Sequence, residues 1–306
     1  MRVKMFALAR DTGNEKTHPA LKKLEEYHFN PIRMRLSMRC FAFFLLGAVA
    51  SLAVVSWARA DWSPELCSPY AEIDTSSGEY RISNNVGSEP TATQCIAARN
   101  VSGEIRAGFR LTHSHERTPY PTFPSIVCGR HPWSSEPTGC LQEAVQLSSI
   151  VALTSNFSVG GAEKAVGECN AAYDLWLLPD TQQDHVGSPI GGVEIMIWPW
   201  SEEMRPGGEK VGSVRLRERV DGTWQRVPYD VYHAAEWGEG WRYVAFVRQE
   251  QRPEGFAAIN LKDPLLYCQK QGWCQASDQL ITVEAGFEIY EGCKGLTTRA
   301  FSVHLR

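Results

Sequence analysis

Carboxyl side chains interrupt three apolar, strand-like runs of this sequence. Glu194 stands in GGVEIMIWPW (residues 191–200), Asp174 in AAYDLWLL, and Glu288 in TVEAGFEIY, where Glu284 precedes it by four residues. Tryptophan rings can stack on the apolar faces of sugars, and carboxyl groups can bind sugar hydroxyls or cleave the bond between two sugars. Hydrolysis of that bond requires a pair of Asp or Glu residues. These residue types therefore predict a carbohydrate site.

Two carboxyl groups that act as such a pair cannot both ionise freely. At roughly 5 Å and an effective dielectric constant near 20, two like charges repel by about 3 kcal/mol, which separates their titrations by roughly two pH units. One carboxyl then stays ionised as the nucleophile while the other keeps its proton as the general acid. Composition and alternation alone do not say which carboxyls face each other.

Alternation of residue types indicates how strands would position these groups. In Val193–Trp198 the odd-numbered residues are apolar and form a core face, while the even-numbered ones, including the glutamate, face the other way. In Ala172–Leu177 the odd-numbered residues again form the core face. Glu284 and Glu288 share one face of the last of these runs. Three strands are thus expected to present a carboxyl on a face away from the core, and for Glu284 the favoured interpretation is structural.

The remainder of the chain predicts an all-β architecture. Short alternating runs recur between Gly, Pro, Asp and Asn residues, and this pattern is typical of a sandwich or barrel. Only Leu261–Gly272 reads as a helix, with Pro264 tolerated in its first turn. No linker, low-complexity tract or repeat divides residues 61–306, so a single domain is expected there.

The first sixty residues read as a targeting region. Arginines precede the apolar run Phe41–Val55, and Ala58-Arg59-Ala60 provides small residues for a signal peptidase, so residues 34–60 are predicted to be a signal peptide cleaved after Ala60. An uncleaved anchor is the alternative. Residues 1–33 are either an over-long start assignment or a short cytoplasmic tail. The expected product is secreted and extracellular, with no membrane contact after cleavage.

Charge and cysteine content narrow the class of partner. Without residues 1–60, Lys plus Arg falls from 31 to 21 and Asp plus Glu from 35 to 31, so the formal net charge changes from −4 to −10. Such a chain is not expected to bind nucleic acid or anionic membranes. Eight cysteines remain, an even number that favours disulfides in an exported domain. The expected pairs are Cys67 with Cys95, Cys128 with Cys140, and a third of Cys268 with Cys274 that leaves Cys169 and Cys293.

Four ordered motifs resemble glycoside hydrolase family 12. They are the segment from CNAAYDLWLL to GGVEIMIWPW, the closing AGFEIYEGCKGLTTRAFSV, the N-terminal GEYRISNNVGSEPTATQC, and FRLT followed by YPTFPSIVCGRH. The resemblance implies a jelly-roll sandwich of two curved antiparallel sheets with one short helix and a concave substrate cleft. It implies a β-glucan substrate. The sequence contains no cofactor motif, phosphate loop or metal cluster, so we expect no cofactor and no metal, and we expect a monomer.

The same resemblance assigns roles to individual residues. Glu194 matches the family's nucleophile and Glu288 its general acid and base, while Asp174 would hydrogen-bond the nucleophile and tune its ionisation. The remaining matches are expected to bind or flank the sugar: Asn85, Asn170, His131, Met196, Trp198 and Tyr290.

One departure from the family pattern concerns the cleft. The family usually has a tryptophan where this chain has Gly87, after Asn84-Asn85-Val86, and Trp133, Trp62 or Trp176 are candidates to replace it. The predicted function is a retaining endo-β-1,4-glucanase. The alternatives are a xyloglucan-specific endoglucanase, a non-catalytic carbohydrate-binding jelly roll, and a xylanase on the related family 11 fold.

Overall fold

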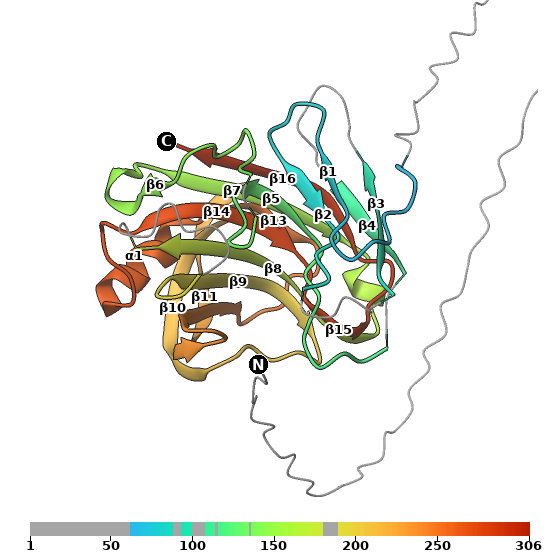
Figure 1. The fold of residues 1–306 in the computed structure, drawn as a ribbon. Helices are drawn as coiled ribbons and strands as arrows, with labels where there is room; N and C mark the ends of the chain where they lie inside the picture. The colour runs from blue at the N-terminus through green and yellow to red at the C-terminus, as the bar shows by residue number, and fades with distance from the viewer. Residues whose placement is uncertain (1–61, 88–92, 100–107, 114–115, 135, 180–188) are drawn as a thin grey trace, which may run out of the picture. The chain divides into compact units, whose positions relative to one another are not determined.

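The computed structural model describes residues 62–87, 93–99, 108–113, 116–134, 136–179 and 189–306 (Figure 1). The predicted signal peptide and the stretch before it lie outside the described residues. All described residues belong to one compact unit, Ser56–Arg306. None of the helices in this described part is long and apolar enough to span a membrane.

Strands dominate the described part of the chain. Its single α-helix is α1 (Lys262–Gln271), and two 3-10 turns are η1 (Leu147–Ser149) and η2 (Ala162–Lys164). The strands are β1 (Glu72–Asp74), β2 (Arg81–Ser83), β3 (Cys95–Arg99), β4 (Gly108–His113), β5 (Ser125–Gly129), β6 (Val145–Gln146), β7 (Leu153–Gly160), β8 (Gly167–Leu178), β9 (Val193–Glu202), β10 (Glu209–Val220), β11 (Thr223–Trp237), β12 (Trp241–Arg248), β13 (Gly255–Asn260), β14 (Gln279–Gly286), β15 (Ile289–Gly292) and β16 (Thr297–Leu305).

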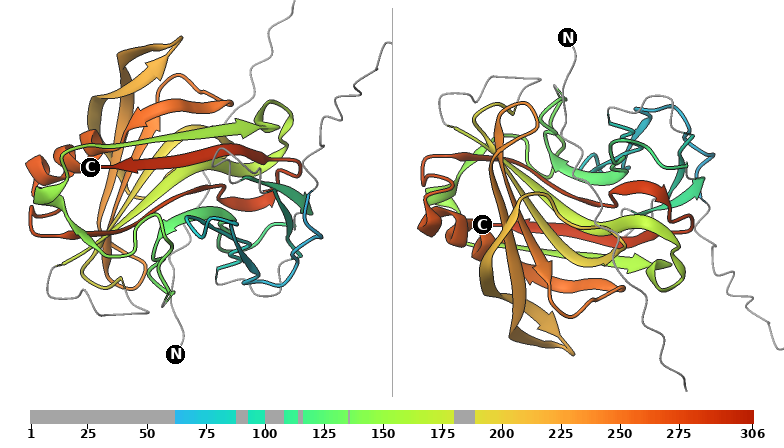
Figure 2. Two further views of the ribbon diagram at one scale, coloured as in Figure 1. Left: turned by 90° about the horizontal axis from the view of Figure 1, so that it is seen from above. Right: turned by 90° about the horizontal axis from the view of Figure 1, so that it is seen from below.

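These strands form a continuous hydrogen-bonded path that curves back over itself (Figure 2). The path runs β1-β2-β5-β14-β8-β9-β12-β11-β10-β13-β7-β16-β4-β3, with β15 beside β8 and β6 beside β14. Aromatic contacts show the two layers meeting: Tyr173 of β8 lies 5.5 Å from Phe157 of β7 and 5.9 Å from Phe256 of β13, between ring centroids. The predicted jelly-roll architecture is confirmed, with the addition that β9 and β12 pair in parallel.

The predicted alternation is also confirmed. On β8 and β9 the side chains of Tyr173, Leu175, Ile195 and Ile197 lie in the main core between the layers. The intervening residues lie on the opposite face, where a second apolar cluster includes Met196 with neighbours from β8, β9 and β12. Because strand side chains alternate between faces, the same backbone supports the core and presents the candidate site.

Three disulfides are formed among the described residues, and one predicted pairing is wrong. Cys67 bonds to Cys95, and Cys128 to Cys140, as predicted. Cys268 on α1 and Cys274 just beyond it are instead free and buried, while Cys169 bonds to Cys293. The closeness of Cys268 and Cys274 in sequence was misleading. Strand β15 pairs with β8 so that Ile289 stands opposite Cys169, and this pairing brings Cys293 close to Cys169.

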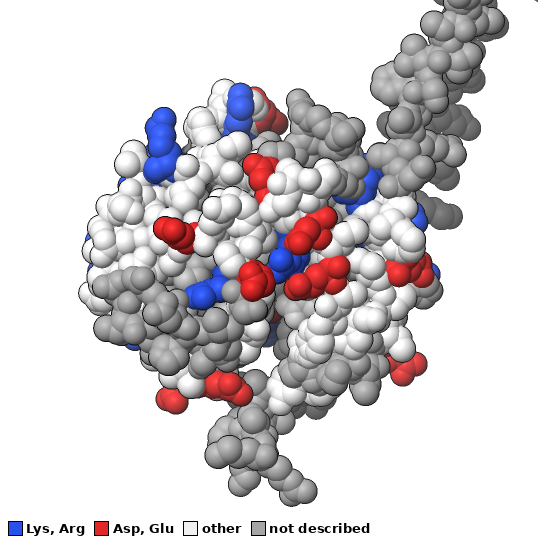
Figure 3. Space-filling view, turned by 45° about the horizontal axis from the view of Figure 1, so that its top comes forward, with Lys and Arg blue, Asp and Glu red and all other residues white. Residues whose placement is uncertain are grey.

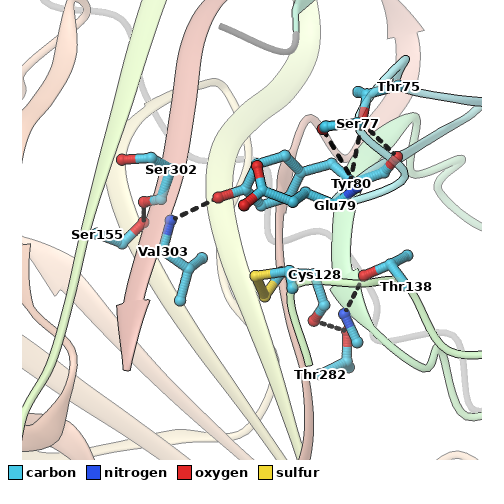
Figure 4. Close-up of a disulfide and its surroundings, with 12 residues drawn as sticks. Thr75, Ser77, Glu79, Tyr80, Cys128, Thr138, Ser155, Thr282, Ser302 and Val303 are labelled. Carbon is cyan, nitrogen blue, oxygen red and sulfur yellow. Dashed lines mark hydrogen bonds between the residues drawn. A yellow bond between two sulfur atoms is a disulfide. The ribbon is translucent and has the colours of Figure 1, made fainter. Parts of the chain in front are cut away.

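The Cys128–Cys140 disulfide lies beside a set of hydrogen bonds that join several elements (Figure 4). The Thr282 hydroxyl donates to the carbonyl of Cys128 at 3.1 Å, and the Tyr80 hydroxyl accepts from the backbone N–H of Val303 at 3.2 Å. The first contact joins β14 to β5, and the second joins β16 to the residue just before β2.

The predicted helix is confirmed over Lys262–Gln271. Pro264 lies in the first turn, where its missing N–H has no partner to lose. Gly272 follows with φ 73°, and its N–H donates to the carbonyls of Cys268 and Gln269, which ends the helix in the left-handed conformation that glycine tolerates.

Candidate active site

Strand register brings the candidate carboxyls together on one face of the sheet. Strand β8 lies between β14 and β9, so that Asp174 stands opposite Glu284 on one side and opposite Met196 on the other. Two residues further along β8, Trp176 stands opposite Glu194. Directly opposite residues have Cβ atoms about 4.5–5.5 Å apart, and diagonal neighbours remain within reach of long side chains. Glu194 is thus a diagonal neighbour of Asp174.

Glu194 is half-buried at the start of β9 and is held by an indole. The Trp241 Nε1–H group donates to Glu194 Oε2 at 2.7 Å. Burial, followed by the charge of Asp174, raises the pKa of Glu194 well above its ordinary value, and the indole hydrogen bond opposes this by favouring the ionised form. The neutral Trp241 N–H group therefore stabilises the Glu194 carboxylate, which burial removes from water.

Glu288 lies just beyond β14 and is clamped by Asn170 of β8. The Asn170 Nδ2–H group donates to Glu288 Oε2, and the backbone N–H of Glu288 donates to Asn170 Oδ1 at 3.0 Å. The backbone N–H of Asn170 also donates to the carbonyl of Glu288 at 3.0 Å. Burial raises the pKa of Glu288 to about 7, against the lowering effect of the Asn170 amide. This carboxyl thus retains a large protonated fraction near neutral pH.

Asp174 is buried and interacts with several of these groups. The Trp176 Nε1–H group donates to Asp174 Oδ2 at 2.9 Å. Burial, the charge of Glu284 and the charge of Glu288 raise the pKa of Asp174 well above its ordinary value. Because Asp174 in turn raises the pKa of Glu194, the carboxyls titrate as a coupled group.

An aromatic group adjoins Glu194. The rings of Trp133, Trp176 and Trp241 lie 5.4–5.9 Å apart, between centroids. Trp176 is buried, whereas Trp133 is 46% exposed and lies 5.2 Å from the His131 ring. Trp133 is therefore one ring contact away from the indole that binds Glu194, with its surface open to a ligand.

His131 lies next to Glu284, which stands opposite Asp174 of the candidate site. Its Nε2 atom lies 3.8 Å from Glu284 Oε1, and burial lowers the pKa of His131 to about 4. The imidazole is consequently neutral at physiological pH.

The other residues expected to contact sugar differ in exposure. Met196 and Trp198 are buried in the apolar cluster beneath the site face, and Asn170 is fully buried in its contact with Glu288. Tyr290 is half-buried, packs against the same cluster and has the Arg117 guanidinium 5.4 Å from its ring centroid. Almost no surface is left for a ligand on Met196, Trp198 and Asn170, which pack against other residues of the site. Tyr290 is partly exposed and has surface available for a ligand.

Asn85 lies at the side of this cluster. It is half-buried, its carbonyl accepts the backbone N–H of Phe123 at 2.8 Å, and Phe123 packs against the cluster. Its Oδ1 accepts the N–H of Gly87 at 3.2 Å, which shapes the turn where the family usually has tryptophan. Of the candidate replacements, Trp62 is covered by the guanidinium groups of Arg99 and Arg110, so Trp133 alone combines exposure with contact to the site.

Charge at the site is largely buried rather than spread over the surface. On the face drawn in Figure 3, basic and acidic side chains of the described residues are scattered over a mainly uncharged surface. Metal-ligand spacing within the described chain occurs at Glu65, Cys67 and Cys95, but these two cysteines are bonded to each other. The carboxyl groups that strand register brings together have the side-chain chemistry for proton transfer and nucleophilic attack.

Comparison with known protein families agrees with this geometry. Residues 78–306 match the model of glycosyl hydrolase family 12. The chain belongs to glycosyl hydrolase family 12.

Similar family 12 proteins include enzymes of known structure. The endoglucanase Cel12A from Rhodothermus marinus is 27% identical with a TM-score of 0.66, and the alignment covers 80% of this chain and 99% of that one. A family 12 xyloglucanase from Bacillus licheniformis shares the fold at 23% identity, with a TM-score of 0.62 over 79% of this chain and 100% of that one. Endoglucanase S from Pectobacterium parmentieri is 30% identical over 171 residues, which is 56% of this chain and 60% of that relative.

Sequence reasoning missed two residues that the structure places at this candidate site. Trp241 is the first residue of β12, which pairs in parallel with β9 so that Tyr243 stands opposite Glu194. This pairing brings the Trp241 indole within hydrogen-bond distance of the Glu194 carboxylate. The sequence alone does not reveal the pairing. Glu284 was interpreted as structural, yet it stands directly opposite Asp174. Its shared face with Glu288 in TVEAGFEIY was the available signal.

Proposed function

We propose that this family 12 protein is a secreted, retaining endo-β-1,4-glucanase that hydrolyses β-glucan chains of plant-type polysaccharides. The observation that carries the proposal is the placement of two carboxyls on one face of the sheet, each with its own hydrogen-bond donor: Trp241 for Glu194 and Asn170 for Glu288. Glu194 accepts an indole N–H that favours its ionised form, and Glu288 has a pKa of about 7 that leaves it partly protonated. One nucleophile and one acid is the combination that a retaining mechanism requires.

The mechanism proceeds in two displacements. The Glu194 carboxylate attacks the anomeric carbon while Glu288 gives its proton to the departing glycosidic oxygen, so that a glycosyl-enzyme ester forms as the glycosidic bond breaks. Glu288, now ionised, takes a proton from water, and the resulting hydroxide equivalent attacks the anomeric carbon and releases Glu194. Two inversions restore the original anomeric configuration. Asp174 lies beside the nucleophile and influences its ionisation through charge.

Activity of the Glu194→Gln variant tests the role of the nucleophile. The purified protein should release reducing ends from barley β-glucan, and Glu194→Gln should lower kcat by at least about a thousandfold, because an amide cannot form the ester. Glu143→Gln, a change at an exposed glutamate outside the site, should leave the rate unchanged. Substantial activity in Glu194→Gln would exclude Glu194 as the nucleophile.

The stereochemical outcome tests the retaining mechanism separately. Proton NMR of early hydrolysis should show the β-anomer of the new reducing end before mutarotation equilibrates it. Initial appearance of the α-anomer would indicate an inverting reaction.

Xyloglucan is the alternative substrate, and Gly87 is the observation that favours it. The glycine removes a stacking platform for an unbranched glucan and leaves that turn without a side chain. Initial rates on carboxymethyl cellulose, barley β-glucan, xyloglucan and xylan would rank the candidate substrates. Binding of glucan without turnover on any of them would support the non-catalytic alternative. Size-exclusion chromatography would test the proposed monomer.

A further inference from the structure

Glu284 occupies an unusual position for a residue with no assigned role. It is fully buried, and it stands directly opposite Asp174 across β14 and β8. Its Oε2 atom accepts the Ser125 hydroxyl at 2.9 Å, and Asp174 Oδ2 accepts the Trp176 indole. The second oxygens, Glu284 Oε1 and Asp174 Oδ1, are both buried and have no hydrogen-bond partner among the described residues.

One proton between the two carboxyls explains why neither Glu284 Oε1 nor Asp174 Oδ1 has another hydrogen-bond partner. If both groups were ionised, two buried like charges would face each other with neither solvated. A proton on one group converts this repulsion into an O–H···O hydrogen bond and satisfies both oxygens together. The position of that proton is restricted to the pair Glu284 Oε1 and Asp174 Oδ1, because the other two oxygens already accept hydrogen bonds from Ser125 and Trp176.

Cations near Glu284 do not replace this proton. On the loop after β5, His131 lies 3.8 Å away but is neutral, since burial lowers its pKa to about 4. Across the sheet, Arg81 of β2 is separated from Glu284 by Val127 of β5 and is bound by Asp74 at 2.8 Å.

The acidic groups around Glu284 act in the opposite direction to a cation. Burial, Glu72 of β1 and Glu194 of β9 raise the pKa of Glu284 to about 8, against the hydrogen bonds of Ser125 and Thr282. Glu288 acts on the pair through Asp174. Burial and the charge of Glu284 also raise the pKa of Asp174 well above its ordinary value, so the two carboxyls compete for this one proton.

We propose that Glu284 is a positioning residue that shares one proton with Asp174 and, through the resulting hydrogen bond, orients the Asp174 carboxyl group beside Glu194. The pair then carries one proton and one charge. Asp174 keeps one oxygen bound to Trp176 and the other to Glu284, which fixes its carboxylate plane relative to the nucleophile. This inference rests on the proposed role of Glu194.

Two substitutions at one position separate the neutral hydrogen-bond donor from other roles. Glu284→Gln keeps a neutral donor of the same size, whereas Glu284→Leu keeps the volume and removes the donor. On β-glucan, Glu284→Gln should retain kcat/KM within about twofold. Glu284→Leu should lose at least about tenfold in kcat, and its acid limb should move up by about one pH unit, because the ionised form of Asp174 has lost its donor.

The opposite pattern would overturn the proposal. If Glu284→Gln is as impaired as Glu284→Leu, then the site needs a charged Glu284, for example in an ion pair with His131. If Glu284→Leu matches the wild type in rate and pH profile, the donor has no positioning role.

Stability measured against pH decides the protonation state without any activity. The folded pKa of Glu284 is about 8 and the ordinary value is 4.5, so its stabilising contribution is fully present below about pH 4.5 and is lost as pH rises toward 8. The amide of the Glu284→Gln variant cannot titrate, so the free energy of unfolding of wild type minus that of Glu284→Gln should fall steadily over this range. A constant or rising difference would show that the pair holds no shared proton in the folded protein and would reject the proposal. Failure of the wild type on all glucans would reject the proposed function instead.

Discussion

At the scale of single residues, the site depends on neutral donors bound to acidic groups. A neutral donor favours the ionised form of a carboxyl less strongly than a cation does, so burial still raises the pKa of each group. The pKa of each of these carboxyls is therefore raised, while each keeps a hydrogen bond that favours its ionised form. The donor and acceptor pairs are Trp241 with Glu194, Asn170 with Glu288, Trp176 with Asp174, and Ser125 with Glu284.

Asn170 should control the alkaline limb of the pH profile. Above about pH 7 Glu288 loses its proton and can no longer protonate the leaving oxygen, so the rate should fall there. Because the Asn170 amide lowers the pKa of Glu288, Asn170→Ala should move this limb to higher pH while reducing kcat about tenfold through lost positioning. The measurement is kcat/KM from pH 5 to 9. A limb that stays in place would show that another group sets it.

Trp241 should control the acid limb instead. Trp241→Phe keeps the ring but removes the N–H bound to Glu194, so the pKa of the nucleophile should rise and the acid limb should move up by about one pH unit. We expect a loss of about tenfold to a hundredfold in kcat. Trp224→Phe, at an exposed tryptophan of β11, is the matched control and should behave as wild type. Equal effects of both substitutions would contradict a specific contact.

At the scale of elements, residue alternation predicted on which face of a strand each side chain lies. Strand register determined which side chains on different strands become neighbours. The sequence correctly separated Tyr173 and Leu175 from Asp174, because a period of two is a local property of a strand. It did not place Trp241 on Glu194 or pair Cys169 with Cys293, since both depend on which strands become neighbours. The family resemblance supplied the carboxyl assignments, which the structure brings to one face.

The loop after β5 should supply the exposed surface for sugar stacking. Trp133 is exposed and contacts Trp241, which is bound to Glu194. Loss of an aromatic platform removes about 1 kcal/mol, so Trp133→Ala should raise KM for long β-glucan oligosaccharides about fivefold with little change in kcat. Trp224→Ala, at a comparably exposed tryptophan, should leave KM unchanged. A fall in kcat at constant KM would point to the nucleophile rather than to binding.

At the scale of the whole molecule, one disulfide joins the two segments that hold Glu288, the proposed general acid. Cys169 directly precedes Asn170 on β8, and Cys293 follows β15, the strand that begins just after Glu288. The disulfide closes a loop with a sequence separation of 124 residues, far longer than the separation of 12 for Cys128 and Cys140. In the chain-entropy treatment, longer loops give the larger stabilisation of the fold.

The two disulfides should therefore differ in both stability and activity when removed. Replacing Cys169 and Cys293 by serine should lower the free energy of unfolding by about 5 kcal/mol, and replacing Cys128 and Cys140 by about 3 kcal/mol. Only the first change lies beside the Asn170 clamp on Glu288, so at a temperature where both variants remain folded it alone should reduce kcat. Denaturant unfolding and initial rates on β-glucan measure the two effects. Equal losses of kcat in both variants would show that the bond stabilises the fold without positioning the acid.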